Sequence, residues 1–245
     1  LDGPLVGVMQ LNNAKDETRN IVPLSEHNQV FVSFFANNAA VTIERGIMNR
    51  ELILRMMSMA ELRDPTETGA HVQRVGAFSA EIYERWAINR GIDEEKIKAT
   101  RDLIRLAAML HDVGKVGIPD AILKKPGKLT DEEFEIIKKH TVYGAKLFSS
   151  ITSELDQMSL EIALCHHEKW SGGGYPGCIP ELEESSETKR GQNIPITARI
   201  TALADVYDAL CSRRSYKEAM PEEDVYRIIR ESSGTHFDPE VVEAF

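Results

Sequence analysis

Histidine and carboxylate side chains in this sequence have the types and spacings of metal ligands. Five of the seven histidines, two of them adjacent, stand where a metal site would use them. Imidazole and carboxylate groups are the side chains that hold first-row metals such as Fe, Mn, Zn and Ni. The candidates exceed what a single structural zinc site needs, so we expect a cluster of metal ions. The candidate ligands are Glu67, His71, His111, Asp112, His140, His166, His167 and Asp205.

The apolar pattern places these candidates on helices that must pack inward. Glu67 and His71 are four residues apart, so their side chains project from one helix face. Side chains that project from facing helices into a bundle are how helical proteins build sites for two metals. A lone buried histidine is more often a hydrogen-bonded core residue. The combination supports a metal site, because so many buried imidazoles and carboxylates would otherwise leave charges uncompensated, at several kcal/mol each.

From residue 64 onward the sequence predicts helices throughout. Side-chain caps mark several helix starts: Asp93, Thr130 with Glu133 in a capping box, and Asp238 before Pro239. The expected helices cover residues 65–89, 93–112, 130–148, 153–169, 195–212, 221–234 and 239–245. No alternating strand pattern occurs in this part, so we expect an all-α bundle.

The first 60 residues have a different pattern. Residues 5–12 (LVGVMQLN) are typical of a β-strand, and Ser25 is a good N-cap for a helix over 26–62. A capped helix longer than about 25 residues indicates a coiled-coil-like connector. Its apolar stripe consists of Ala36, Ala40, Ile43, Ile47, Leu54 and Met57.

Length and charge limit the class of protein. The 245 residues can hold one good-sized core and a smaller piece. A net charge of −10 argues against binding a nucleic-acid polymer through a broad basic face. No apolar run is long enough to cross a bilayer, and three cysteines without a CxxC pair favour free thiols. We therefore expect a cytoplasmic protein without membrane insertion.

Four motifs in order resemble the HD-GYP phosphodiesterases. They are DPTETGAH (64–71), LHDVGK (110–115), HHEKWSGGGYP (166–176) and ADVYDAL (204–210), with His140 between the second and third. An HD pair alone would indicate only the broad HD phosphohydrolase superfamily, whereas HH followed by GYP is much more specific. The resemblance implies a mainly α fold, an HD-superfamily helical bundle with a short N-terminal strand and a long connector helix. It covers residues 61–245, which would be the HD-GYP catalytic domain.

The resemblance also implies an activity. A phosphodiesterase of this family hydrolyses cyclic di-GMP to pGpG, and in some cases on to GMP, with a metal-bridging hydroxide as nucleophile. It implies two or three divalent metal ions, with Fe or Mn favoured over Zn or Ni, held by the eight candidate ligands. Glu67 and His71 are the natural pair for a third ion, unless one of them only orients another ligand. The implied catalytic residues are Lys115, His111 and Asp112, and the implied substrate contacts are Lys115, Gly174, Tyr175, Arg214 and Lys217.

Two departures from the family pattern concern the substrate loop. Ser171 stands where the family usually has Asp or Asn, and the loop over 177–193 is longer and more acidic than usual. Neither departure removes a ligand. Two other classes stay open: a di-iron oxygen-binding or oxygenase protein, and a catalytically inactive module that binds cyclic dinucleotides.

The N-terminal segments GVMQLNN and PLSEHNQVFVSFFANNAAVTIERG resemble the last strand and last helix of a GAF sensor domain. Residues 1–60 would then be the C-terminal part of such a domain with its connector helix. The alternative is an N-terminal helical hairpin with no sensory role. The expected partners are a second copy of the chain, through the connector helix, and GGDEF diguanylate cyclases.

Overall fold

The computed structural model describes residues 7–61, 69–179, 189–212 and 219–245, with the backbone alone for 57–61. The chain divides into two compact units, Leu1–Leu54 and Arg55–Phe245. The division falls inside the long helix α1 (Glu26–Glu61), six residues before the boundary expected from the sequence. Among the described helices, none has the length and apolar character that a bilayer span requires.

In the first unit the helix is confirmed and the strand is not. The Ser25 hydroxyl accepts a hydrogen bond from the Asn28 N–H at 3.2 Å, as expected of the N-cap of α1. The predicted strand over 5–12 is wrong for its described part, because residues 7–12 have no regular secondary structure. A strand requires a neighbouring ladder, and the described residues of this unit offer only an isolated bridge between Lys15 and Ile21.

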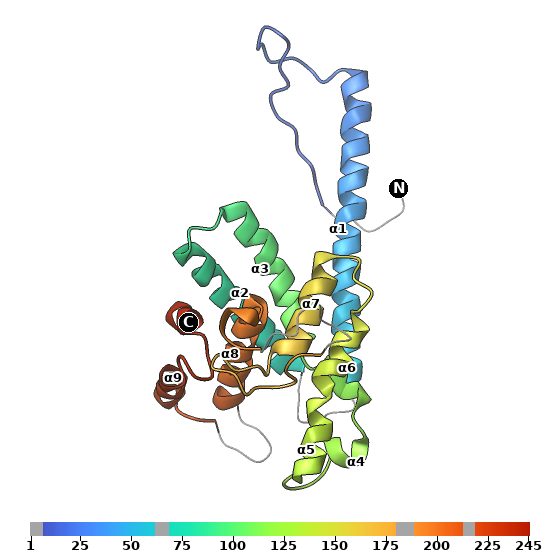
Figure 1. Cartoon of the computed structure of the whole chain (residues 1–245). Helices are drawn as coiled ribbons and strands as arrows, with labels where there is room; N and C mark the ends of the chain where they lie inside the picture. The colour runs from blue at the N-terminus through green and yellow to red at the C-terminus, as the bar shows by residue number, and fades with distance from the viewer. Residues whose placement is uncertain (1–6, 62–68, 180–188, 213–218) are drawn as a thin grey trace. The chain divides into compact units, whose positions relative to one another are not determined.

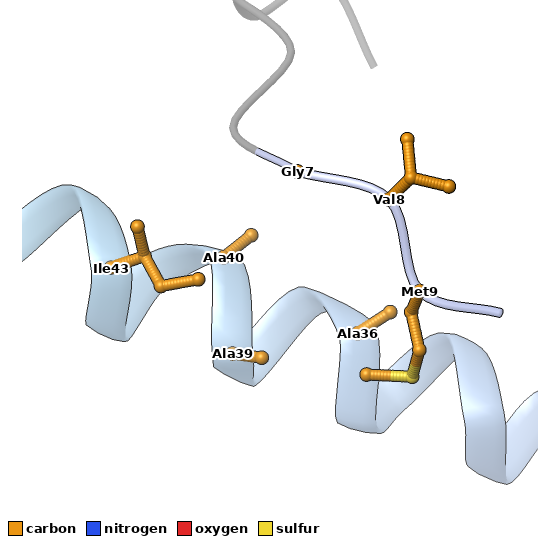
Figure 2. Close-up of a pocket in the computed structure, with 7 residues that line it drawn as sticks. All are labelled: Gly7, Val8, Met9, Ala36, Ala39, Ala40 and Ile43. Atoms are coloured by element: carbon orange, nitrogen blue, oxygen red, sulfur yellow. The ribbon is translucent and has the colours of Figure 1, made fainter.

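A cavity of about 270 Å³ separates this N-terminal segment from α1. Figure 2 shows Met9 lying against the helix near Ala36, whereas Val8 points away from it. Val8 is 85% exposed, so the segment covers only part of the apolar face of α1.

The second unit is a helical bundle. Helices α2 (Gly69–Asn89), α3 (Glu94–Ala108), α7 (Glu154–Cys165) and α8 (Ile196–Cys211) pack against one another in its middle (Figure 1). Their shared core includes Val75, Ile104, Ile162, Ile200 and Leu203, whose side chains are fully buried. Helix α6 (His140–Leu147) packs against α7 and against the 3-10 helix η1 (Val113–Gly117). The remaining helices are α4 (Asp120–Leu123), α5 (Asp131–Lys138), η2 (Gly191–Asn193), α9 (Glu222–Glu231) and α10 (Pro239–Ala244).

The side-chain caps predicted at helix starts are confirmed, whereas the start predicted at residue 65 lies outside the described residues. Asp93 accepts from the Glu95 N–H at 3.0 Å, and Thr130 forms the expected capping box with Glu133. Asp238 caps α10 in the same way. These caps lie within three residues of the groups that they satisfy, which makes them visible in the sequence.

Three predicted helix ends are wrong. The helix expected over 93–112 ends at Ala108, and the one expected over 153–169 ends at Cys165. The helix expected over 130–148 is interrupted at Lys139, which separates α5 from α6. The short helix α4, which follows Pro119, was not expected. Each of the three wrong ends lies next to a histidine of the candidate metal site.

Candidate metal centre

Histidine side chains bond to main-chain carbonyls at these three helix ends. In each, the ring Nδ1 lies within hydrogen-bond distance of a main-chain carbonyl three or four residues earlier. The distances are 2.8 Å from His111 to Ala108, 2.7 Å from His140 to Ile137 and 2.9 Å from His166 to Ile162. A carbonyl oxygen can only accept, so Nδ1 carries the proton. In a neutral ring the other nitrogen, Nε2, then presents a lone pair.

These lone pairs converge on the carboxylate of Asp112. Asp112 Oδ1 lies 3.0 Å from His140 Nε2 and 3.7 Å from His166 Nε2. Asp112 Oδ2 lies 3.2 Å from His111 Nε2 and 3.0 Å from Lys115 Nζ. The two oxygens of one carboxylate thus face histidines from different helix ends.

Asp112 belongs to one of two groups of potential ligand atoms and contacts a histidine of the other. One group consists of Asp112, His140, His166 and His167, and the other of His71, His111 and Asp205. Within each group the ligand atoms lie within 4.8 Å of one another. The structure therefore brings together seven of the eight predicted ligands. Glu67, the eighth, lies outside the described residues, and so do Arg214 and Lys217.

The donor atoms face one another in a way that fits bound cations. His71 donates from Nδ1 to Asp208 at 2.7 Å, so its Nε2 lone pair faces Asp205 Oδ1 at 3.4 Å. Among the described residues, His71 Nε2 has no hydrogen-bond partner. The Nε2 atoms of His140 and His166, both acceptors, lie 3.5 Å apart. Lone pairs in such contact repel one another, and a metal ion between them converts the repulsion into ligation.

The protonation states of His166, His167 and Asp112 agree with metal binding. Burial lowers the pKa of His166, and it lowers the pKa of His167 far below its ordinary value, so both rings are neutral. Burial alone would raise the pKa of Asp112, but the positive charge of Lys115 is the largest opposing effect, and the pKa is lowered. Neutral imidazoles and an ionised carboxylate are the forms that bind metal. His166, His167 and Asp112 are therefore in the forms that bind metal.

Asp208 is a buried carboxylate of the site that the sequence did not single out. Its side chain is 2% exposed and accepts hydrogen bonds from both His71 and Arg74. Burial raises its pKa, but the bonds from His71 and Arg74 outweigh this and bring the pKa to about 2. Asp208 lies three residues after Asp205 on α8, on the same helix face, and this spacing was available in the sequence.

The loop of Gly174 and Tyr175 lies against the metal centre. The Tyr175 ring stacks on His167 with 4.6 Å between centroids, and its N–H donates to the His167 carbonyl at 3.3 Å. A Cβ added to Gly174 would come within 2.5 Å of the Glu168 Cα. Burial raises the pKa of the Tyr175 phenol, which keeps its proton and can donate it in a hydrogen bond.

Glu168 anchors this loop at Gly177. The sequence analysis did not identify it as a residue of the site. Glu168 directly follows the histidine pair and is 3% exposed, and its Oε1 accepts from the Gly177 N–H at 2.6 Å. Ser171, the departure from the family pattern, also serves as an anchor. Its N–H and its hydroxyl both donate to the Thr235 carbonyl at 2.9 Å.

We predict that Glu168→Gln weakens substrate use without removing metal. The amide keeps the size of the carboxylate but loses the charge that strengthens its bond to Gly177, which is worth roughly 1–2 kcal/mol, or about tenfold in kcat/KM. Kinetics and metal analysis on the same preparation check this. Glu154→Gln, an exposed change at the start of α7, is the control. Metal loss in Glu168→Gln would contradict its assignment to the loop.

A sequence profile of the HD domain matches residues 56–241. This is more than half of the chain, and the chain therefore belongs to the HD domain family.

Curated relatives carry the names of cyclic-dinucleotide phosphodiesterases. A "Cyclic di-GMP phosphodiesterase" of Vibrio cholerae is 42% identical over 237 residues, covering 95% of this chain and 45% of the relative. One of Thermotoga maritima is 46% identical over 193 residues, covering 79% of this chain and 47% of the relative. A "3'3'-cGAMP-specific phosphodiesterase 2" of Vibrio cholerae is 40% identical over 227 residues, covering 90% of this chain and 40% of the relative. The chain thus spans less than half the length of these relatives.

Proposed function

We propose that this chain carries an HD-GYP phosphodiesterase activity that hydrolyses cyclic di-GMP to pGpG, with GMP as the product if a second bond is cut. One observation carries the proposal: the Asp112 carboxylate belongs to one group of potential ligands and contacts a histidine of the other, next to Lys115. The names of the relatives support the substrate class. Divalent ions held there would lower the pKa of the attacking water and offset the charge of the phosphodiester.

The side chains of this site have different proposed roles in binding and orienting the substrate. Lys115 is partly exposed, so it can reach a phosphate oxygen while it remains paired with Asp112 at 3.0 Å. Tyr175, fixed by its stack on His167, can donate its phenolic proton to a substrate oxygen. The close fit of Gly174 on Glu168 keeps the loop near the histidines. Arg214 and Lys217 complete the proposed substrate contacts by resemblance alone.

The number and kind of metal ions are part of the proposal. Asp112 supports at least two ions, because one carboxylate oxygen faces each group of ligands. We propose Fe or Mn, since mixed imidazole and carboxylate ligands suit both, with Zn and Ni as alternatives. His71 lies with His111 and Asp205, so a third ion held by Glu67 and His71 stays a prediction.

A second substrate is favoured by one specific observation. The relative named for 3'3'-cGAMP is nearly as similar to this chain as those named for cyclic di-GMP. The two substrates differ in one base and share the phosphodiester ring that the metal centre would act on. Contacts to the bases, and not the ligand set, must therefore decide between them.

Product chromatography with metal analysis tests the proposal. We expect anaerobically prepared protein, loaded with Fe²⁺ or Mn²⁺, to convert cyclic di-GMP to pGpG, and a parallel reaction with 3'3'-cGAMP to give the selectivity. Intact cyclic di-GMP in metal-replete protein would contradict the proposal. Nucleotide binding by calorimetry without hydrolysis would then indicate an inactive binding module, and oxygen-dependent spectra would indicate a di-iron oxygen protein.

The N-terminal unit supports a separate proposal about assembly. We propose that residues 1–60 are a GAF-domain remnant and that α1 joins two copies of the chain. Phe31, Phe34 and Phe35 on α1 are each at least 60% exposed, and exposed apolar patches of this kind mark interaction surfaces. The interaction with GGDEF diguanylate cyclases stays a prediction from the resemblance.

A further inference from the structure

His71 is oriented differently from His111, His140 and His166. Those three lie at helix ends, and each ring N–H donates to a main-chain carbonyl three or four residues earlier in the chain. His71 instead lies in the first turn of α2, where the carbonyls accept from the following turn of the helix. Its Nδ1 bonds to an acceptor from another part of the fold.

Helix α8 supplies that acceptor. Asp208 Oδ2 lies 2.7 Å from His71 Nδ1, and Asp205 Oδ1, on the same helix, lies 3.4 Å from His71 Nε2. Because residues three apart share a helix face, α8 presents one carboxylate to each nitrogen of the same ring. Only Asp205 belongs to a group of potential ligands.

Arg74 holds Asp208 in place. Its Nε and Nη2 donate to the two carboxylate oxygens at 2.5 Å and 2.9 Å. The same Nη2 lies 2.9 Å from the Ser212 hydroxyl, which is 3.3 Å from Asp208 Oδ2. A guanidinium fork of this kind fixes the plane of a carboxylate. With both oxygens bound and the side chain 2% exposed, Asp208 is not placed to ligate a metal itself.

We propose that Asp208, clamped by Arg74, is a positioning residue that fixes the tautomer and ring orientation of His71. While Nδ1–H donates to Asp208, Nε2 keeps its lone pair toward His111 and Asp205. In the other tautomer, Nε2 would carry the proton and could not bind a metal. The inference rests on the proposed function only in requiring that metal ions occupy this site.

A titration of metal-free protein with Mn²⁺, followed by the electron paramagnetic resonance signal of the free ion, tests this role. Asp208→Asn can offer its amide N–H₂ to His71 Nδ1 and so favours the wrong tautomer. We expect the affinity for at least one Mn²⁺ equivalent to fall about 10–100-fold. Asp224→Asn is the matched control, because it breaks an exposed Asp–Arg pair, with Arg227, on the same unit. Its Mn²⁺ affinity should stay within about twofold of the original, as for a surface pair.

A double-mutant cycle separates positioning from general structural support. If Asp208 acts through His71, Asp208→Asn should weaken Mn²⁺ binding in the original protein and cause no further loss in His71→Ala. Equal losses in both backgrounds, or an unchanged affinity in Asp208→Asn, would overturn the proposal.

If Asp208→Asn does not fold, a second variant at Arg74 tests whether Asp208 positions His71. Arg74→Gln leaves the carboxylate and removes its clamp, and we expect a loss of Mn²⁺ affinity between those of the original protein and Asp208→Asn. An unchanged affinity in folded Arg74→Gln would count against the clamp. Since no substrate is present, these results are independent of hydrolysis. A protein that shows this coupling and leaves cyclic di-GMP intact would refute the proposed function alone.

Discussion

Asp112→Asn is expected to abolish phosphodiester hydrolysis while the helical bundle persists. Asp112 is the residue whose two oxygens face both groups of ligands, so the change weakens both at once. An amide also places an N–H₂ group where an acceptor is required. Loss of several kcal/mol of transition-state stabilisation corresponds to a fall of at least about 10³-fold in kcat/KM.

The measurements for Asp112→Asn are turnover of cyclic di-GMP, metal content and the helical circular dichroism signal. We expect lower metal content and an unchanged helical signal, because the apolar core of α2, α3 and α8 does not include Asp112. Asp120→Asn is the control, since it weakens an exposed Asp–Lys pair with Lys124 and should keep its activity. Turnover close to that of the original protein, with metal confirmed, would refute the assignment of Asp112.

Helix starts could be predicted from the sequence because their signals are local. Asp93 and Thr130 satisfy backbone N–H groups two and three residues ahead, and a cap of this kind acts without tertiary structure. The predicted strand over 5–12 lacked such support. A strand depends on a partner for its hydrogen bonds, and the apolar pattern alone does not supply one.

The predictions of helix ends were wrong next to the candidate metal centre, and the reason is physical. The apolar periodicity continues past Ala108 and Cys165, so it favours longer helices. The His111 and His166 rings bond to carbonyls of their own helices, and the backbone turns there to bring Nε2 to Asp112. Departures from local rules are expected at functional sites, where the geometry serves a ligand at some cost to the helix.

The ligand types could be predicted, but most of their supporting contacts could not. Histidine and carboxylate side chains can be recognised as possible metal ligands in a sequence. Asp208, in contrast, has its role because it contacts His71, which lies 137 residues away. Glu168 differs from a surface glutamate only through burial under the loop at Gly177. Such contacts depend on tertiary packing. The three-residue spacing of Asp205 and Asp208 places both on one helix face, but it does not reveal the contact of Asp208 with His71.

Gly114 illustrates a contact of this kind, and its replacement has the largest expected effect on stability. A Cβ at Gly114 would lie 1.9 Å from the His140 carbonyl oxygen and 2.3 Å from the Gly144 nitrogen. Both are backbone atoms, so no side chain can move aside. The close approach of η1 to α6 brings His140 to Asp112. Glycine is required here by space and not by φ, since its φ lies outside the left-handed region.

We therefore predict that Gly114→Ala costs about 3 kcal/mol or more in the free energy of unfolding, at or above the upper end of overpacking effects. Urea unfolding followed by circular dichroism gives this value. Gly91→Ala is the matched control: its φ of +67° is strained for alanine, yet nothing lies within 4 Å of the added Cβ, so it should cost only roughly 1–2 kcal/mol. Any Gly114→Ala protein that folds must have displaced α6, and with it His140, so its Mn²⁺ affinity should also fall. Stability equal to that of Gly91→Ala, with normal Mn²⁺ binding, would show that η1 and α6 do not meet as closely as the structure places them.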